Sequence, residues 1–322
     1  MPPVAIAVVG AGPWGLTLAR AFAGIEHARL SWICELDAER RRRAGQAHPD
    51  VRLAETVDEV VADPDVDAVV VAVDSARHHA VGMRALVGHK HLFVEKPLAL
   101  RARDADELCA TAAARGLVLT AGHLLLHHPA IHQARQLLAD EQLGEVLYFE
   151  SRRVTPGAPR TPGSAWWALA PHDVSLALHL FGAVPMTVRA TGGAWGSAGE
   201  DNVASAALEF RDGKTAHIHV ARYGDGKQRQ AMVAGTRATL TFDELRPEGA
   251  LRLWTPDGGT RSVACEPVDP LLAQCRTFVA CVARRDIRGG NGRHAAEVAM
   301  VLEAGERSMR DEGVVQLVRA TA

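Results

Sequence analysis

The first 122 residues alternate short, continuously apolar runs with stretches in which apolar residues recur every three or four positions. Continuous runs of this kind are typical of parallel strands buried on both faces, and the longer period is typical of helices that cover such a sheet. The expected strands are residues 4–9, 30–34, 67–73, 91–94 and 117–121. The expected helices are residues 16–22, 57–62, 78–87 and 104–115. This alternation predicts an α/β domain with a doubly wound, right-handed parallel sheet.

The rest of the chain has consecutive strand-like segments joined by short turns that contain glycine, such as residues 211–214. Strands in direct succession favour antiparallel pairing. The expected strands are residues 146–153, 186–194, 203–210, 215–220, 228–234, 239–242, 251–254 and 314–318. The expected helices are residues 128–138, 171–181, 270–283 and 294–309. We therefore expect an α+β domain with a large, mainly antiparallel open sheet, in which the Pro-, Gly- and Arg-rich loop at 157–163 is mobile.

Three glycines stand where the first apolar run gives way to the first helical period. Gly10, Gly12 and Gly15 form the pattern G-x-G-x-x-G. Between a strand and a helix, the first glycine allows a tight turn, the second lets the backbone approach a pyrophosphate, and the third lets the helix pack closely on the strand. The helix N-terminus offers N–H groups and a positive dipole end to that phosphate. The pattern alone is weak, because a glycine-rich turn can be no more than a turn.

An acidic residue after the second expected strand strengthens the case for a dinucleotide. Glu35 lies about 20 residues beyond Gly15, where a carboxylate accepts hydrogen bonds from both ribose hydroxyls. A carboxylate here repels the 2′-phosphate of NADP, and Leu36 offers no group to hold one, so NAD is favoured over NADP. The arginines at 40–43 could partly restore NADP binding, although four successive arginines are more typical of a solvated helix face.

Composition bounds the class of protein. The chain has 322 residues, 48% of them hydrophobic and 23% charged, which is enough to bury a large core in two domains. The formal net charge of -2 gives no electrostatic reason to bind nucleic acid or an anionic membrane. No apolar run is long enough to cross a membrane and the N-terminus lacks the features of a signal peptide, so a cytoplasmic protein is expected.

Metal ions and disulfides are not expected. The five cysteines are scattered and form no C-x-x-C pair, which is typical of small core residues in a reducing compartment. The chain has 15 histidines, but their spacing matches no H-E-x-x-H or comparable zinc-ligand set. The neighbouring pairs that were compared with such sets are His78/His79, His89/His91 and His127/His128.

Several further motifs together resemble the Gfo/Idh/MocA oxidoreductases. Besides the glycine loop they are VEKPLA at 94–99, AGH at 121–123, LGEV at 143–146, WALAPHD at 167–173 and DNV at 201–203. The resemblance covers nearly the whole chain and is nearest to the nucleotide-sugar 3-dehydrogenase-like branch. It implies NAD(P)-dependent hydride transfer at a secondary alcohol or ketone of a sugar, nucleotide-sugar or cyclitol-like substrate. It also implies an NAD(P)-binding Rossmann domain at 1–122 and a substrate-binding and oligomerisation domain at 123–322.

Lys96 is the first candidate catalytic residue. It precedes a proline at the C-terminal end of a parallel strand, so its backbone is extended, Pro97 can be cis, and the side chain overhangs the crevice in which a nicotinamide would lie. Burial and the positive nicotinamide would lower the pKa of its ammonium toward the range useful for proton transfer. From the residues alone, a lysine paired with Glu95 on a surface turn is an equal alternative. The family resemblance favours a catalytic and substrate-binding Lys96.

His172 is the second candidate, at the start of the helix expected at 171–181. A helix N-terminus disfavours an imidazolium, so His172 is expected to be neutral and able to accept a proton. The alternative is a histidine that only packs. The expected substrate contacts are Lys96, His123, Trp167 and Asp173, of which Asp173 could instead cap or orient its neighbours. The expected cofactor contacts are Gly10, Gly12, Pro13, Trp14, Gly15, Glu35, Val73, Glu95 and Lys96.

Ala168 departs from the family pattern, which usually has an aspartate four residues before this histidine. Lys96 and His172 could suffice, Asp173 or the substrate could replace the missing carboxylate, or dehydrogenase activity could be lost. Two further functions stay open. One is a non-catalytic NAD(P)-binding sensor or regulator of the same fold, and the other is an NAD-dependent hydrolase or lyase that uses transient oxidation.

The second expected sheet also bears on assembly. Alternating apolar residues such as Val203, Ala207 and Ile218 would leave a large patch in water on one face of the sheet. Patches of that kind are usually covered in an oligomer. A homodimer or homotetramer through the C-terminal sheet is therefore expected.

Overall fold

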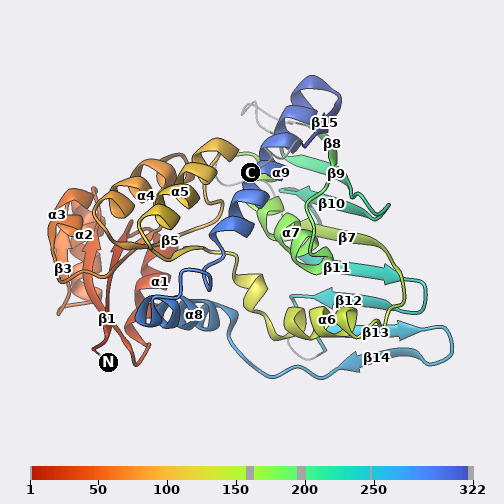
Figure 1. Cartoon of the computed structure of the whole chain (residues 1–322), viewed down its shortest axis with the longest axis horizontal. Coiled ribbons are helices and arrows are strands. Elements are labelled where there is room, and N and C mark those ends of the chain that lie inside the picture. The colour runs from red at the N-terminus through yellow and green to blue at the C-terminus, as the bar shows by residue number, and fades with distance from the viewer. Residues whose placement is uncertain (1, 157–162, 194–200, 247–248, 318–322) are drawn as a thin grey trace. The chain divides into compact units, whose positions relative to one another are not determined.

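The computed structural model describes residues 2–156, 163–193, 201–246 and 249–317, and its contacts divide the chain into two units (Figure 1). The first unit comprises Met1–Leu124 and Asp269–Ala299, and the second comprises Leu125–Val268 and Met300–Ala322. The first unit thus takes in a late segment that the predicted boundary after residue 122 does not include. The loop expected to be mobile at 157–163 lies, apart from Gly163, outside the described residues. No helix in the described ranges is long and apolar enough to cross a membrane.

A parallel six-stranded sheet forms the first unit, as the apolar runs predict. Its strands stand in the order β3-β2-β1-β4-β5-β6, and every pair is parallel. Their bounds are β1 Val4–Val9, β2 Ala28–Cys34, β3 Arg52–Ala54, β4 Ala68–Val71, β5 His91–Val94 and β6 Leu119–Ala121. The helices between them are α1 Pro13–Ala23, α2 Ala38–Ala47, α3 Val57–Ala62, α4 His78–Val87 and α5 Ala102–Ala114. This strand order reverses direction between β1 and β4, which is where doubly wound folds bind nucleotides.

Helices cover both faces of this sheet because alternate residues of each strand point to opposite sides. On one face, Ile6 and Val8 of β1 pack in a cluster with Leu18 and Phe22 of α1. On the other face, Ala7 and Val9 pack in a separate cluster that contains residues of α3, α4 and α5. Burial on both faces explains why these strands read as continuous apolar runs.

The late segment adds the helix α8 Pro270–Arg284 and the start of α9 Gly292–Asp311 to the first unit. Asp269 caps α8 by accepting a hydrogen bond from the backbone N–H of Leu271 at 2.8 Å. Phe278 of α8 then packs edge-to-face with Phe22 and Phe93, at ring-centre distances of 6.2 and 5.6 Å. The first hydrophobic core is therefore completed by a helix from near the end of the chain.

A nine-stranded sheet forms the second unit (Figure 1). Its order is β14-β13-β12-β11-β7-β10-β9-β8-β15, and its pairs are antiparallel except for the parallel pair β7–β10. The strands are β7 Val146–Val154, β8 Thr187–Gly193, β9 Val203–Glu209, β10 Thr215–Ala221, β11 Gln228–Gly235, β12 Thr239–Asp243, β13 Leu251–Thr255, β14 Gly259–Val263 and β15 Val314–Gln316. The helices α6 Pro129–Ala139 and α7 Ala165–Phe181 complete the unit, together with the end of α9. This confirms a mainly antiparallel sheet.

One face of the second sheet is less apolar than expected. Ile218 is 1% exposed, because it lies on the face of β10 that contacts α7. Val203 and Ala207 are half-buried, and their neighbours on the same side of the sheet are polar, among them Ser205, His217 and His219. The expectation that Ile218 contributes to an exposed apolar patch is wrong. The oligomer stays a prediction.

Candidate functional site

The glycine loop adopts the conformation that its three glycines predict. Gly10 has φ +101°, a left-handed conformation, and a Cβ there would lie 2.5 Å from the carbonyl oxygen of Ala72. A Cβ on Gly15 would collide with the carbonyl of Gly10 at 1.9 Å, so the helix α1 can approach the loop only without a side chain. A Cβ on Gly12 would instead point into open space, with no described atom within 4 Å. The backbone at Gly12 is thus open to a phosphate, directly before the N-terminus of α1.

Glu35 closes the other side of this loop. Its carboxylate is only 8% exposed and accepts hydrogen bonds from the backbone N–H groups of Ala11 at 2.8 Å and Asp37 at 3.1 Å. Arg40 lies 3.9 Å from the same carboxylate. The carboxylate is therefore held beside the glycine loop, as a ribose-binding acid requires.

A cavity of about 530 Å³ lies at this edge of the sheet. It is lined by residues at or just after the carboxyl ends of β1, β2 and β4, including Val9, Gly10, Gly12, Cys34, Glu35, Ala72 and Val73. Its charged lining is mixed, with Glu35, Glu55 and Asp74 against Arg40, Arg77 and Arg84. Four of the expected cofactor residues thus meet in one cavity. Pro13, Trp14, Gly15, Glu95 and Lys96 are not part of its wall.

The segment after β5 carries Glu95, Lys96 and Pro97, and the Lys96–Pro97 peptide bond is cis. Glu95 is 7% exposed, and its Oε2 accepts a hydrogen bond from the backbone N–H of Lys96 at 3.2 Å. Burial raises the pKa of Glu95, against the opposing effects of a hydrogen bond from Trp14 and the charge of Lys96. Lys96 itself is half-buried. The buried carboxyl group of Glu95 thus accepts hydrogen bonds from the backbone of Lys96 and from the more exposed Trp14.

His123 follows β6 and is 2% exposed. Its ring packs edge-to-face on His294 of α9 at 5.8 Å, and neither ring nitrogen has a hydrogen-bond partner among the described residues. Burial lowers the pKa of His123 well below its ordinary value, and the nearby charges of His294 and Lys96 act in the same direction. His123 is consequently a neutral, buried imidazole in the first unit.

The remaining candidates lie on α7 in the second unit. This helix begins at Ala165, where Ser164 accepts a hydrogen bond from the N–H of Trp167 at 3.2 Å, so Pro171 lies inside the helix and not in its first turn. The expectation that His172 stands at a helix N-terminus is wrong. The positive end of the helix dipole therefore gives no reason for its imidazole to be neutral. His172 is half-buried, and Trp167 donates its indole N–H to Glu306 at 3.0 Å.

Asp173 is 1% exposed and binds Arg153, which extends from β7. The guanidinium donates Nε–H to Oδ2 at 2.8 Å and a second N–H to Oδ1 at 3.3 Å. Burial alone would lower the pKa of Arg153, but the carboxylates of Asp173 and Glu244 raise it. Asp173 is thus engaged in orienting α7 on the sheet. Arg153 was not among the predicted site residues, although it lies on the same face of β7 as the buried residues 149 and 151, where the period of two along a strand would place it.

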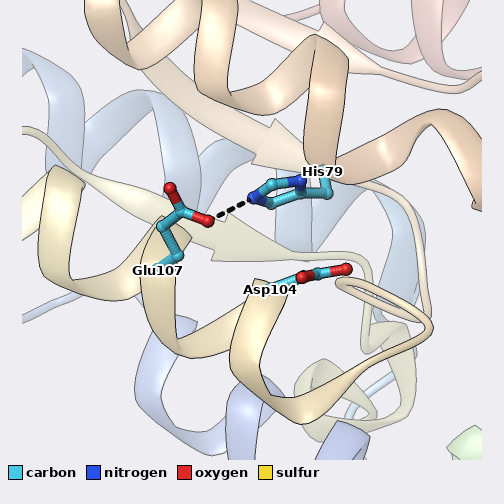
Figure 2. Close-up of side chains that lie close together, drawn as sticks. All are labelled: His79, Asp104 and Glu107. Atoms are coloured by element: carbon cyan, nitrogen blue, oxygen red, sulfur yellow. Dashed lines mark hydrogen bonds and ion pairs between the residues drawn. The ribbon is translucent and has the colours of Figure 1, made fainter.

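Two histidines at the start of α4 also acquire contacts that the sequence did not predict. His78 is buried between two backbone carbonyl groups. His79 lies 2.9 Å from Glu107 of α5, with Asp104 beside them (Figure 2). Within the described ranges, His79, Asp104 and Glu107 form a group of possible metal ligands whose donor atoms lie within 4.8 Å of one another. Asp104 also pairs with Arg103 at 3.2 Å.

Comparison with known proteins agrees with this geometry. A family model described as "Oxidoreductase family, NAD-binding Rossmann fold" matches residues 4–123, and the "GFO/IDH/MocA C-terminal domain" matches residues 131–241. The chain is 33% identical to a UDP-N-acetylglucosamine 3-dehydrogenase of Acidithiobacillus ferrooxidans, over 67% of this chain and 66% of that protein. It is 25% identical to a 2,7-anhydro-N-acetylneuraminate hydratase of Escherichia coli, over 76% of this chain and 69% of that protein.

Among solved structures, that of GenD2 from gentamicin A biosynthesis in complex with NAD is similar along nearly its whole length. Its TM-score is 0.87 at 26% sequence identity, and the match covers 99% of this chain and 97% of that one. The glycine loop, Glu35 and the cavity between them fit NAD, and both halves of the chain match one family. This protein belongs to the Gfo/Idh/MocA family of NAD-binding oxidoreductases.

Proposed function

We propose that this protein is an NAD-dependent dehydrogenase that acts on a secondary alcohol or ketone of a sugar, nucleotide-sugar or cyclitol. The observation that carries the proposal is the cavity lined by Gly10, Gly12, Glu35 and Val73 at the carboxyl ends of the parallel strands. The relative that oxidises UDP-N-acetylglucosamine at C3, as its name states, supports a sugar-like substrate.

We assign the proton chemistry to Lys96 and His172. Bound NAD would supply the acceptor for the hydride. The ammonium of Lys96 would donate a hydrogen bond to the substrate oxygen, which lowers the cost of removing its proton. The imidazole of His172 would accept that proton as the carbon loses its hydride. Family resemblance and the half-buried positions of the two side chains support these roles.

The experiment is a screen of nucleotide-sugars, free sugars and cyclitols with NAD, followed by the absorbance of the reduced nicotinamide. Lys96→Ala and His172→Ala should each lower kcat by roughly 100-fold or more, the usual effect of losing an acid–base group. Lys227→Ala is the matched control, because Lys227 is exposed in the second unit. Turnover that survives Lys96→Ala unchanged would remove Lys96 from the mechanism. No turnover in any variant, with tight NADH binding throughout, would favour the sensor.

Ala168 provides a second arm of the same experiment. It is exposed and lies one helical turn before His172, so an aspartate there would share a face with the imidazole. A nearby carboxylate favours the imidazolium and so raises the pKa of the imidazole. In a plot of kcat against pH, Ala168→Asp should therefore move the acidic limb to higher pH. An unchanged plot would show that the protonation of His172 does not set this limb.

The hydratase among the relatives favours one alternative, an NAD-dependent hydrolase or lyase that oxidises its substrate transiently. Such an enzyme regenerates NAD in each turnover, so product forms without a rise in NADH absorbance. Chromatography of the same reaction mixtures separates the two functions.

A further inference from the structure

His78 is a buried titratable residue to which the proposed chemistry gives no role. It is the first residue of α4 and is 1% exposed. Its Nδ1 lies 2.7 Å from the carbonyl oxygen of Pro97, and its Nε2 lies 3.1 Å from the carbonyl oxygen of Val73. One ring therefore contacts the residue after Lys96 and a residue of the cofactor cavity.

These two carbonyl groups belong to neighbouring loops. The strands β4 and β5 are parallel and pair Val71 with Val94, so the loops that follow them emerge side by side at the same edge of the sheet. The loop after β4 contains Val73, and the loop after β5 contains Lys96 and Pro97. His78 is placed to fix the position of one loop against the other.

The protonation state of His78 decides which contact is a hydrogen bond. Carbonyl oxygens only accept, and a neutral imidazole has a single N–H to donate. Burial lowers the pKa of His78, while the hydrogen bonds to Pro97 and Val73 and the charge of Asp74 oppose this and the charge of Lys96 reinforces it. A neutral ring donates best across the shorter distance, which is the one from Nδ1 to Pro97.

The helix that carries His78 is itself anchored on its neighbour. His79, the next residue, contacts Glu107 of α5 at 2.9 Å (Figure 2). Helix α5 begins at Ala102, shortly after the Lys96 loop. The imidazole of His78 thus projects from a helix end that is attached to the element following that loop.

We propose that His78 is a positioning residue for Lys96: its Nδ1–H holds the Pro97 carbonyl and thereby sets the place of the lysine ammonium relative to the cofactor cavity. The inference rests on the proposed function of Lys96. It does not make His78 a catalytic residue, because both of its ring nitrogens face backbone carbonyl groups.

Paired substitutions test the direction of the hydrogen bond. The amide nitrogen of asparagine takes the place of Nδ1, and that of glutamine takes the place of Nε2. These variants are assayed with a substrate found in the screen above. His78→Ala and His78→Gln should lower kcat about 10-fold or more, because they lose the buried hydrogen bond that positions the acid–base group. His78→Asn keeps that hydrogen bond, so its kcat should stay within about 3-fold of the parent value. KM for NAD should change less than 3-fold in all three, on the same estimate. His27→Ala, at an exposed histidine of the first unit, is the control and should retain kcat.

A spectroscopic measurement tests the proposal without turnover. The chain has four lysines, Lys90, Lys96, Lys214 and Lys227, so after reductive 13C-methylation the Lys96 resonance can be assigned with Lys96→Arg. This resonance should shift and titrate differently in His78→Ala, and should return toward the parent value in His78→Asn but not in His78→Gln. Melting temperatures identify any variant that fails to fold, and 15N-histidine spectra of the parent report the tautomer directly.

The outcomes separate this inference from the proposed function. An unaltered Lys96 resonance in a folded His78→Ala, equal rescue by asparagine and glutamine, or an Nε2–H tautomer in the parent would each overturn the positioning role. Absence of turnover in the parent with every sugar would overturn the proposed function alone, since the Lys96 resonance would still report on His78.

Discussion

At the scale of single residues, Glu35 is the residue that we propose favours NAD over NADP. Its carboxylate is held by the backbone N–H groups of Ala11 and Asp37 at the edge of the cavity. In that position it can accept hydrogen bonds from ribose hydroxyls, and it repels a 2′-phosphate. Among the described ion pairs of the arginines at 40–43, Arg40 pairs with this carboxylate, whereas the other three arginines pair with Glu55 or Glu39.

Glu35→Gln should weaken NADH binding by roughly 10-fold and narrow the preference for NADH over NADPH, because hydrogen bonds to a charged acceptor are worth about 1.5–3 kcal/mol. Fluorescence titration of both reduced cofactors measures the two dissociation constants. Glu55→Gln is the matched control, since Glu55 lines the same cavity but pairs with Arg41 at 3.1 Å. Equal affinities for NADH and NADPH in the parent would show that Glu35 does not discriminate against the 2′-phosphate.

At the scale of elements, α8 links a late part of the sequence to the cofactor-binding unit. Phe278 is 1% exposed and lies in the same cluster as Ile6 and Val8 of the first strand.

Phe278→Ala should lower the free energy of unfolding by about 3–5 kcal/mol, the usual cost of removing a buried phenylalanine. Urea denaturation measures the loss. Ile287→Ala, at a residue 44% exposed, is the control and should cost far less. A loss below about 1 kcal/mol for Phe278→Ala would contradict this packing.

The helix α7 shows how one end of an element changes a chemical argument. The expected start at residue 171 placed His172 against the positive end of a helix dipole. The true start at Ala165 places it near the middle of the helix, where that effect is absent. The protonation state of His172 therefore cannot be argued from the helix dipole, and the Ala168→Asp experiment tests whether this imidazole acts as the base.

At the scale of the whole molecule, half-buried histidines are expected to make stability depend on pH. Burial lowers the pKa of His127 to about 4, with smaller effects from the charges of His132 and His179. Burial also lowers the pKa of His179 to about 4, with smaller effects from Arg135 and His132. Because the unfolded chain takes up these protons near pH 6.5 and the folded chain does so only near pH 4, stability is complete above about pH 6.5 and falls as the pH drops toward 4.

Each of these histidines can remove up to about 1.4 kcal/mol of stability per pH unit within that window. Urea denaturation of the full chain at pH 7.5, 5.5 and 4.5 should therefore show a declining free energy of unfolding. The double variant His127→Gln/His179→Gln should flatten the decline. His27→Gln, which alters an exposed histidine, serves as the control. If the free energy of unfolding of the double variant declines as steeply with falling pH, other titratable groups cause the decline.

Much of the first unit could be predicted because its signals are local. A strand buried on both faces must be apolar at every position, and the glycine loop needs its residue types at fixed spacings. The strands that escaped prediction lack such a signal: β3 has three residues, Arg-Leu-Ala, and β14 is exposed at four of its five positions. Their pairing with β2 and β13 comes from the neighbouring strand and not from their own pattern.

The sequence by itself determined the parallel sheet, the glycine loop, the acid at Glu35 and the family, since each depends on residues close together in the chain. Only the tertiary structure decided that α8 completes the first core, that Arg153 takes both oxygens of Asp173, and that Ile218 faces α7. It alone placed His78 between the carbonyl groups of Val73 and Pro97. The physical reason is that these contacts join residues far apart in the chain. They depend on which faces of the helices and strands pack together, and a local sequence pattern does not specify that.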